Sequence, residues 1–194
     1  MALPDDSLRS IRAAGDLLLG RTEAMRQFDL SVRGFWFSFV GFLFCLPANL
    51  LLMAADRRIA IESGADVASL GRGAAIELLD MALDWSVFPL FLALIARPLG
   101  IGRGFVGFII VRNWASVILA GLSAVSVLPY LAGILGLDFT LILNVLVLGI
   151  SLQFTYRIAR VTLGVPIMMA IGLVVLDFLI TLLIDIAMAS LAAV

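Results

Sequence analysis

The feature that most constrains this chain is the stretch Val165–Met188, twenty-four residues in which Asp177 and Asp185 are the only ionisable groups. A helix needs ~20 mostly apolar residues to cross a hydrocarbon core of ~30 Å, so this stretch is long enough to span a membrane. Asp177 falls near its middle, where a carboxyl side chain costs roughly 2.5–3.5 kcal/mol to insert. We therefore expect neighbouring helices and a polar partner that shelter Asp177 from lipid.

Four further apolar stretches precede this one, and 63% of the 194 residues are hydrophobic. Soluble domains average ~45–50% apolar residues, so the composition also indicates a membrane protein. The chain is predicted to be all-α, a polytopic membrane helix bundle whose membrane domain, residues 34–194, follows an amino-terminal segment, residues 1–33. The five predicted spans are residues 35–54, 78–96, 112–133, 137–156 and 165–188.

Two boundaries leave alternatives open. The segment Asp56–Glu77 is polar and contains three glycines, so we expect a loop with at most a short surface helix. The stretch Phe105–Gly136 would extend ~48 Å as one helix, which is too long for an upright span. Either that helix is strongly tilted, or its first residues lie at the inner surface and the span starts near Arg112. We prefer the second interpretation.

The amino-terminal segment has the pattern of an amphipathic helix, because Leu8, Ile11, Ala14 and Leu18 recur at helical spacing with charged residues between them. Gly20 is expected to break it. Such a helix before a first span is typical of an interfacial helix on the cytoplasmic face of the membrane. The alternative is a helix that packs on cytoplasmic loops of the same protein.

The arginines predict the orientation of the chain. The amino-terminal segment and the second and fourth connections hold most of them, whereas the other side has only Arg57, Arg58 and Arg72. The positive-inside rule then places the amino terminus in the cytoplasm and the carboxyl terminus outside.

Polar residues at membrane depth are the candidates for a functional site. The predicted intramembrane polar cluster consists of Asp177, Arg112, Asn113 and Asn144. One hypothesis pairs Arg112 with Asp177, because a paired charge in a membrane costs less than two lone charges. The competing hypothesis has Asp177 protonated and hydrogen-bonded to Asn144 or to a backbone carbonyl.

A second set of carboxylates is predicted near the outer boundary: Asp80, Asp84 and Asp185. They would form either a solvated outer helix end or an outward-facing cation site.

The composition argues against catalysis. The chain has no histidine and one cysteine, Cys45, so neither a histidine-based triad nor a thiol–imidazole pair can form. The glycine-rich run at residues 100–104 lacks the preceding strand and the lysine of a phosphate-binding loop. We expect no enzyme activity, no cofactor and no bound metal. The net charge of −1 does not favour nucleic acid as a partner.

Two functions from different classes remain. The first is a non-catalytic scaffold, assembly factor or accessory subunit of a membrane complex, whose partners would be the lipid bilayer and either another protein or further copies of this chain. The alternative is a small transporter or channel for a cation or small solute that uses Asp177 and Asp84. A water-accessible cavity that reaches Asp177 would favour transport, and a dry core with Asp177 tied to a neighbour would favour the structural role.

Three short motifs carry a family resemblance: the run from Phe28 to Phe39, the run Arg112-Asn113-Trp114-Ala115, and the region from Arg157 to Asp177. In these the chain resembles a group of small bacterial inner-membrane proteins of unknown function with five spans. The five-span plan is also similar to that of the Yip family of membrane-trafficking proteins. The resemblance implies a bacterial inner membrane, with the carboxyl terminus in the periplasm, and supplies no catalytic residues.

Overall fold

The computed structural model describes residues 3–64 and 70–192, and the side chains of residues 5–64 and 75–191. These residues form helices and no strand. The elements are α1 (Leu3–Leu18), the 3-10 helix η1 (Thr22–Gln27), α2 (Val32–Ser38), α3 (Gly41–Glu62), α4 (Leu70–Ala96), α5 (Gly102–Leu131), α6 (Leu137–Leu163) and α7 (Ile167–Ala192).

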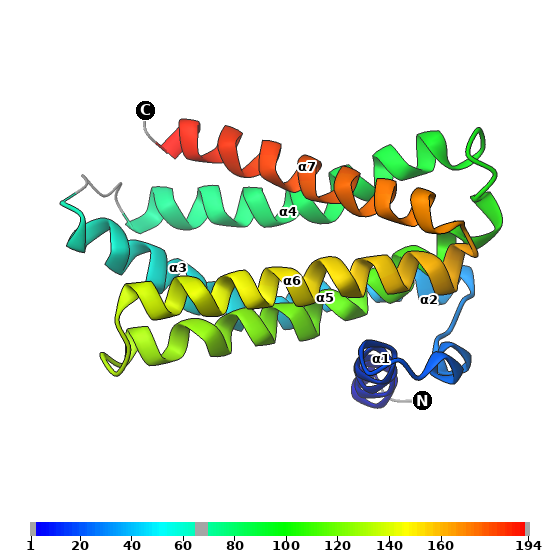
Figure 1. Ribbon diagram of the computed structural model, residues 1–194, viewed down its shortest axis with the longest axis horizontal. Coiled ribbons are helices and arrows are strands. Elements are labelled where there is room, and N and C mark those ends of the chain that lie inside the picture. The colour runs from blue at the N-terminus through cyan, green and yellow to red at the C-terminus, as the bar shows by residue number, and fades with distance from the viewer. Residues whose placement is uncertain (1–2, 65–69, 193–194) are drawn as a thin grey trace.

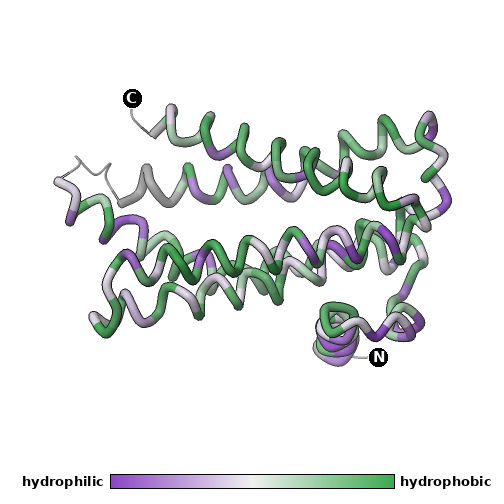
Figure 2. The backbone as a smooth tube through the Cα atoms, viewed as in Figure 1, coloured by the Kyte–Doolittle hydropathy of each residue, from purple (hydrophilic) through white to green (hydrophobic). Residues whose placement is uncertain are grey.

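Five helical segments of the described chain are long and apolar enough to cross a membrane, which confirms the predicted all-α membrane bundle with five spans. The segments are Val32–Glu62, Ala75–Ala96, Gly102–Leu131, Leu137–Leu163 and Ile167–Leu191. Figure 2 shows these long helices as mainly hydrophobic, with isolated hydrophilic residues in their middle, whereas α1 and η1 alternate between the two.

The long helices form two layers that lie side by side (Figure 1). In one layer α5 packs against α3 and α6, and in the other α4 packs against α7. The centre of the bundle is α5, on which Phe108, Ile109 and Trp114 are almost fully buried. Gly164 ends α6 with a φ of 64°, a left-handed conformation that glycine adopts without steric cost, so the chain reverses at once into α7.

Two ends of the bundle are named below. The carboxyl-terminal end is where α7 finishes, and α3 finishes and α4 begins there too (Figure 1). The α2 end is the opposite one, where α2 begins and where the short α4–α5 and α6–α7 connections lie.

The first predicted span, residues 35–54, is wrong in its extent. The structure has two helices there, α2 and α3, which are interrupted at Phe39 and Val40, and α3 continues to Glu62. The predicted loop over residues 56–77 is therefore also wrong at both ends, because α4 begins at Leu70; residues 65–69 of that prediction lie outside the described residues.

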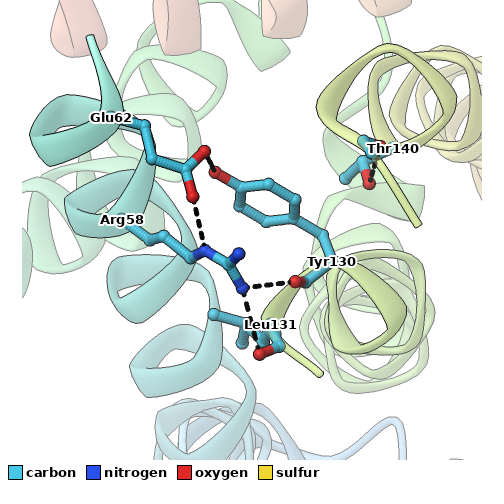
Figure 3. A network of polar contacts seen from close by, with 6 residues as sticks. Arg58, Glu62, Tyr130, Leu131 and Thr140 are labelled. Atoms are coloured by element: carbon cyan, nitrogen blue, oxygen red, sulfur yellow. Dashed lines mark hydrogen bonds and ion pairs between the residues drawn. The ribbon is translucent and has the colours of Figure 1, made fainter. Parts of the chain in front are cut away.

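A polar network explains why α3 continues through its charged residues (Figure 3). Arg58 Nε donates to Glu62 Oε1 at 2.8 Å one turn later, and the Tyr130 hydroxyl donates to Glu62 Oε2 at 2.7 Å. Arg58 Nη1 donates to the backbone oxygens of Tyr130 and Leu131 at 2.6 and 3.2 Å. These carbonyls belong to the last turn of α5, where Tyr130 O also accepts from the backbone N–H of Gly133 at 2.9 Å, so the network ties the last turns of α3 and α5 together.

No helix boundary marks the preferred start of the third span near Arg112, because α5 is continuous from Gly102 to Leu131, and the start of the span within this helix stays a prediction. Packing holds its first turns: a Cβ atom on Gly104 would lie 2.5 Å from the backbone oxygen of Thr162, so α5 and α6 are in close contact there. The other predicted bounds are off by several residues, since α6 extends beyond residue 156, α4 begins before residue 78, and α7 occupies 167–192 rather than 165–188.

The amphipathic helix α1 ends near Gly20 as predicted, and its apolar face packs on the bundle itself. Ala13, Ala14 and Leu17 are at most 1% exposed where α1 crosses α5 and α6. Arg157 of α6 donates from Nη1 to the backbone oxygens of Leu17 and Leu18, which satisfies carbonyls at the end of α1. The helix therefore contacts membrane-spanning helices rather than the cytoplasmic loops of the alternative prediction.

Candidate intramembrane ion site

Arg112 brings a positive charge into the interface between the two layers. It lies ten residues into α5, about 15 Å along the helix from Gly102, and its side chain is 9% exposed. Its guanidinium carbon lies 4.9 Å from the centroid of the Phe88 ring, so one face of the cation contacts an aromatic ring of α4. A buried guanidinium needs an anionic partner, and the structure provides two.

The predicted pair of Arg112 with Asp177 is present. Arg112 Nη2 donates to Asp177 Oδ1 of α7 at 2.9 Å, and the Asp177 side chain is 15% exposed. The same nitrogen lies 3.9 Å from Oδ2 of Asp84 on α4, which is within ion-pair range but beyond hydrogen-bond distance. One cation of α5 therefore lies between carboxyl groups of two different helices of the other layer.

Asp84 has a second contact that sequence reasoning missed. The Thr181 hydroxyl of α7 donates to Asp84 Oδ1 at 2.7 Å, which ties α7 to α4. Thr181 follows Asp177 by one helical turn and Asp185 follows after another, so all three share a face of α7. That spacing was visible in the sequence, but a threonine in an apolar helix gives no signal without its partner.

A cavity of about 400 Å³ adjoins these groups, between the two layers. Its lining includes the Arg112–Asp177 pair and Asp84, and it also includes Glu77, Asp80 and Asp185 towards the carboxyl-terminal end. Exposure falls along this path: Glu77 is exposed, the Asp84 side chain is 32% exposed, and the Arg112 side chain is 9% exposed. At the α2 end, fully buried Phe88, Leu92 and Phe108 fill the interior.

The rest of the lining is mostly apolar and comes mainly from α3, α4, α5 and α6. It includes Cys45, Leu46, Met53 and Leu119, together with Trp85 of α4. The cavity therefore has one acidic wall, formed by α4 and α7, and one apolar wall.

The charge of the cavity is strongly unbalanced. Five carboxyl groups, those of Glu77, Asp80, Asp84, Asp177 and Asp185, share the lining with one arginine. Within the described residues, no three acidic or cysteine side chains are close enough to hold a metal ion. Asp80, Asp84 and Asp185 therefore share a cavity, as the hypothesis of an outward-facing cation site expects, but they do not converge on one point. The arrangement suits protons or an extended organic cation better than a compact metal ion.

Two members of the predicted polar cluster lie elsewhere. Asn113 is fully buried on another side of α5, where its Nδ2 donates to Ser38 Oγ at 2.9 Å. Asn144 of α6 accepts a hydrogen bond of 2.6 Å from the Ser126 hydroxyl and does not reach Asp177. Adjacent residues of a helix point about 100° apart, so Asn113 faces away from Arg112. The predicted cluster is therefore corrected: Arg112 and Asp177 remain, and Asp84 and Thr181 join them.

No family model, no curated protein and no solved structure matches this chain.

Proposed function

We propose that this protein is a small cation transporter of the bacterial inner membrane, in which protons reach Arg112, Asp84 and Asp177 through the acidic cavity. The observation that carries the proposal is that Asp177 lines the cavity. A transport role requires such access to Asp177, whereas a purely structural role does not. Ionisable residues within membrane spans are costly, and they commonly mark ion paths and proton relays.

The proposed orientation has the cavity facing the periplasm. Arginines such as Arg33, Arg97 and Arg103 lie at the α2 end of the bundle, and the positive-inside rule then makes this the cytoplasmic end. The closed side of the site would face the cytoplasm. Passage across the membrane would require the interface around Phe88 and Phe108 to open.

The scaffold or accessory-subunit function stays a prediction, and we place it second. It needs Asp177 only as an internal tie between helices, which the 2.9 Å contact with Arg112 supplies. It does not explain three further carboxyl groups, of Glu77, Asp80 and Asp185, along a cavity that leads to the tie.

Access to the cavity is tested by cysteine labelling in membranes. The native Cys45 is first replaced by alanine, and a single cysteine is placed at Ser116, which lines the cavity. Membrane-impermeant thiol reagents of opposite charge are then added from the periplasmic side. The cationic reagent is expected to react about 10-fold faster or more, because an acidic cleft concentrates cations. The control is Val125→Cys, which is 63% exposed on α5 outside the cavity lining and would face lipid.

Transport is tested in liposomes that contain the purified protein and a trapped pH-sensitive dye. A potassium diffusion potential, negative inside, is expected to drive proton entry that Asp177→Asn abolishes. Asp138→Asn is the matched control, because Asp138 is an exposed carboxylate at the start of α6 outside the cavity lining. Equal fluxes in the wild type and in Asp177→Asn would contradict the proposal, and so would equal labelling of Ser116→Cys by both reagents.

A further inference from the structure

We propose that the acidic cavity binds a small organic ammonium ion that also carries a neutral oxygen atom, in a hydroxyl or a carbonyl group. Asp84 holds the ammonium group, Arg112 donates to the oxygen, and the apolar wall contacts the carbon chain between them. The inference rests on the proposed function and deepens it, because it names the class of cation that enters the cavity. It concerns binding and can be tested without measuring transport.

The first argument is the charge beside Arg112. Asp177 Oδ1 and Asp84 Oδ2 lie 2.9 and 3.9 Å from the same guanidinium nitrogen. Asp84 is ionised here, because Thr181 donates its hydroxyl to Oδ1 and the guanidinium opposite Oδ2 has only donors. Asp177 is at charge-assisted hydrogen-bond distance and is ionised too. Two carboxylates and one guanidinium leave a net charge of −1, which a ligand cation neutralises.

Asp84 has the acceptor that an ammonium group needs. Its Oδ1 is taken by Thr181 at 2.7 Å, whereas no hydrogen bond from the described residues reaches its Oδ2. The side chain is 32% exposed and lines the cavity, so a ligand can approach the carboxylate from there. Asp80 lies one helical turn away on α4, and Asp185 lies one turn beyond Thr181 on α7. Further carboxylates thus line the route by which a cation reaches Asp84.

Arg112 supplies the reason for an oxygen atom in the ligand. Its side chain is 9% exposed and lines the cavity, and its Nη1 is buried without a hydrogen-bond partner among the described residues. A buried donor without an acceptor is costly. A second anion is disfavoured here, because Asp84 and Asp177 already exceed the charge of the guanidinium. A neutral oxygen supplies the acceptor without repulsion, once the guanidinium turns Nη1 towards the cavity.

The apolar part of the lining fits the carbon chain of such a molecule. Leu46 and Met53 of α3 and Leu119 of α5 belong to it, and Trp85 of α4 adds an aromatic ring, whose face attracts ammonium groups. The volume of about 400 Å³ is in the range of small-molecule sites. A metal ion fits less well, because no three acidic or cysteine side chains of the described residues are close enough to hold one.

The test is isothermal titration calorimetry of the full chain in lipid nanodiscs at neutral pH, with three probes of nearly equal size. 4-Amino-1-butanol carries both groups, pentylamine replaces the hydroxyl by a methyl group, and 1,4-butanediol replaces the ammonium group by a hydroxyl. The amino alcohol is expected to bind most tightly. Pentylamine should bind about 10-fold more weakly, because it leaves Arg112 Nη1 unpaired, and the diol should show no binding in the same concentration range. Empty nanodiscs correct for partition of the probes into lipid.

Two variants separate the roles of the two groups. Asp84→Asn is expected to weaken the binding of 4-amino-1-butanol about 10-fold or more, because it removes the anion that holds the ammonium group. Arg112→Lys keeps a cation beside Asp177 but has a single head nitrogen, so the preference for the amino alcohol over pentylamine should fall to about 2-fold or less. Asp138→Asn is the matched control and should bind all three probes as the wild type does, because Asp138 is an exposed carboxylate outside the cavity lining.

Equal binding of 4-amino-1-butanol and pentylamine by the wild type would overturn the proposal, and so would unchanged binding by Asp84→Asn. Circular dichroism identifies a variant that has failed to fold, and the comparison of the three probes on the wild type then decides. Binding of the amino alcohol without proton flux in liposomes would reject the proposed transport and keep this site. Flux without binding would reject the site and keep the transport.

Discussion

The two carboxyl groups beside Arg112 predict strongly non-additive effects of mutation. Because Asp84 and Asp177 are alternative partners for one guanidinium, either should compensate for the loss of the other. The perturbation is a double-mutant cycle of Asp84→Asn and Asp177→Asn, in which each change replaces a carboxyl group by an amide of nearly the same shape. The measured quantity is the free energy of unfolding.

The magnitudes follow from the distances. Asp84→Asn should cost less than about 1 kcal/mol, because Asp84 makes no hydrogen bond with Arg112 and asparagine can still accept from Thr181. Asp177→Asn removes a charge-assisted hydrogen bond worth about 1.5–3 kcal/mol, and a movement of Arg112 towards Asp84 should recover part of it. The double variant leaves a buried guanidinium without an anion, which should cost about 3–5 kcal/mol.

The assay is reversible unfolding of purified protein in mixed detergent micelles, followed by loss of helical circular dichroism. The expected coupling, the excess of the double variant over the sum of the single ones, is about 1–2 kcal/mol, well above the ~0.5 kcal/mol within which independent sites add. Additive effects within that limit would refute the view that both acids serve one cation. A large loss from Asp84→Asn alone would refute the view that Asp177 is the main partner of Arg112.

Two further predictions concern the α2 end of the molecule. Gly104→Ala should clearly lower stability, because its Cβ atom would lie 2.5 Å from the Thr162 backbone oxygen. Gly172→Ala is the control and should be neutral or slightly stabilising, because its Cβ atom would have no atom within 4 Å. Thermal unfolding in detergent compares the two variants. The Ser31 hydroxyl and backbone N–H hold the pKa of Asp29 below its usual value. Ionised Asp29 therefore stabilises the fold at any pH above its unfolded pKa of ~3.9. This contribution is lost as the pH falls through the lower pKa of the folded state. Asp29→Asn should therefore be less stable than the wild type at neutral pH and approach it in acid, and a constant difference across the titration would contradict this.

The number of spanning helices was predictable because it depends on length and hydrophobicity alone. Their ends were not, because contacts distant in the sequence determine them. Arg58 and Glu62 are polar enough to predict a loop, yet Tyr130 and the last carbonyls of α5 hold them in α3. The interruption at Phe39 and Val40 lies within a predominantly apolar run, so the mean hydropathy gives no sign of it.

The site was predictable in part for a related reason. A lone arginine and a lone aspartate within spans predict a pair, because each is costly alone. Which further groups join them depends on the rotation of each helix about its axis, and hydropathy does not report that rotation when a helix is apolar on all sides. Asn113 was assigned to the cluster as a polar residue at membrane depth, and its side chain donates to Ser38 instead.

The divergence of Arg112 and Asn113 has a consequence for how the two layers are connected. Asn113 joins α5 to α2 of its own side through Ser38, beside the interruption between α2 and α3, whereas Arg112 joins α5 to α4 and α7 of the other layer. Both links start from one turn of the most buried helix. A change in the partner of Arg112 would therefore alter the contact between α5 and the α4–α7 layer. At the same turn, Asn113 holds the opposite side of α5 against α2. Because interiors are close-packed and respond by discrete rearrangement, the α4–α7 pair would move as a unit rather than deform locally. Thr181 supports this, since its bond to Asp84 keeps α4 and α7 together whichever acid holds the cation.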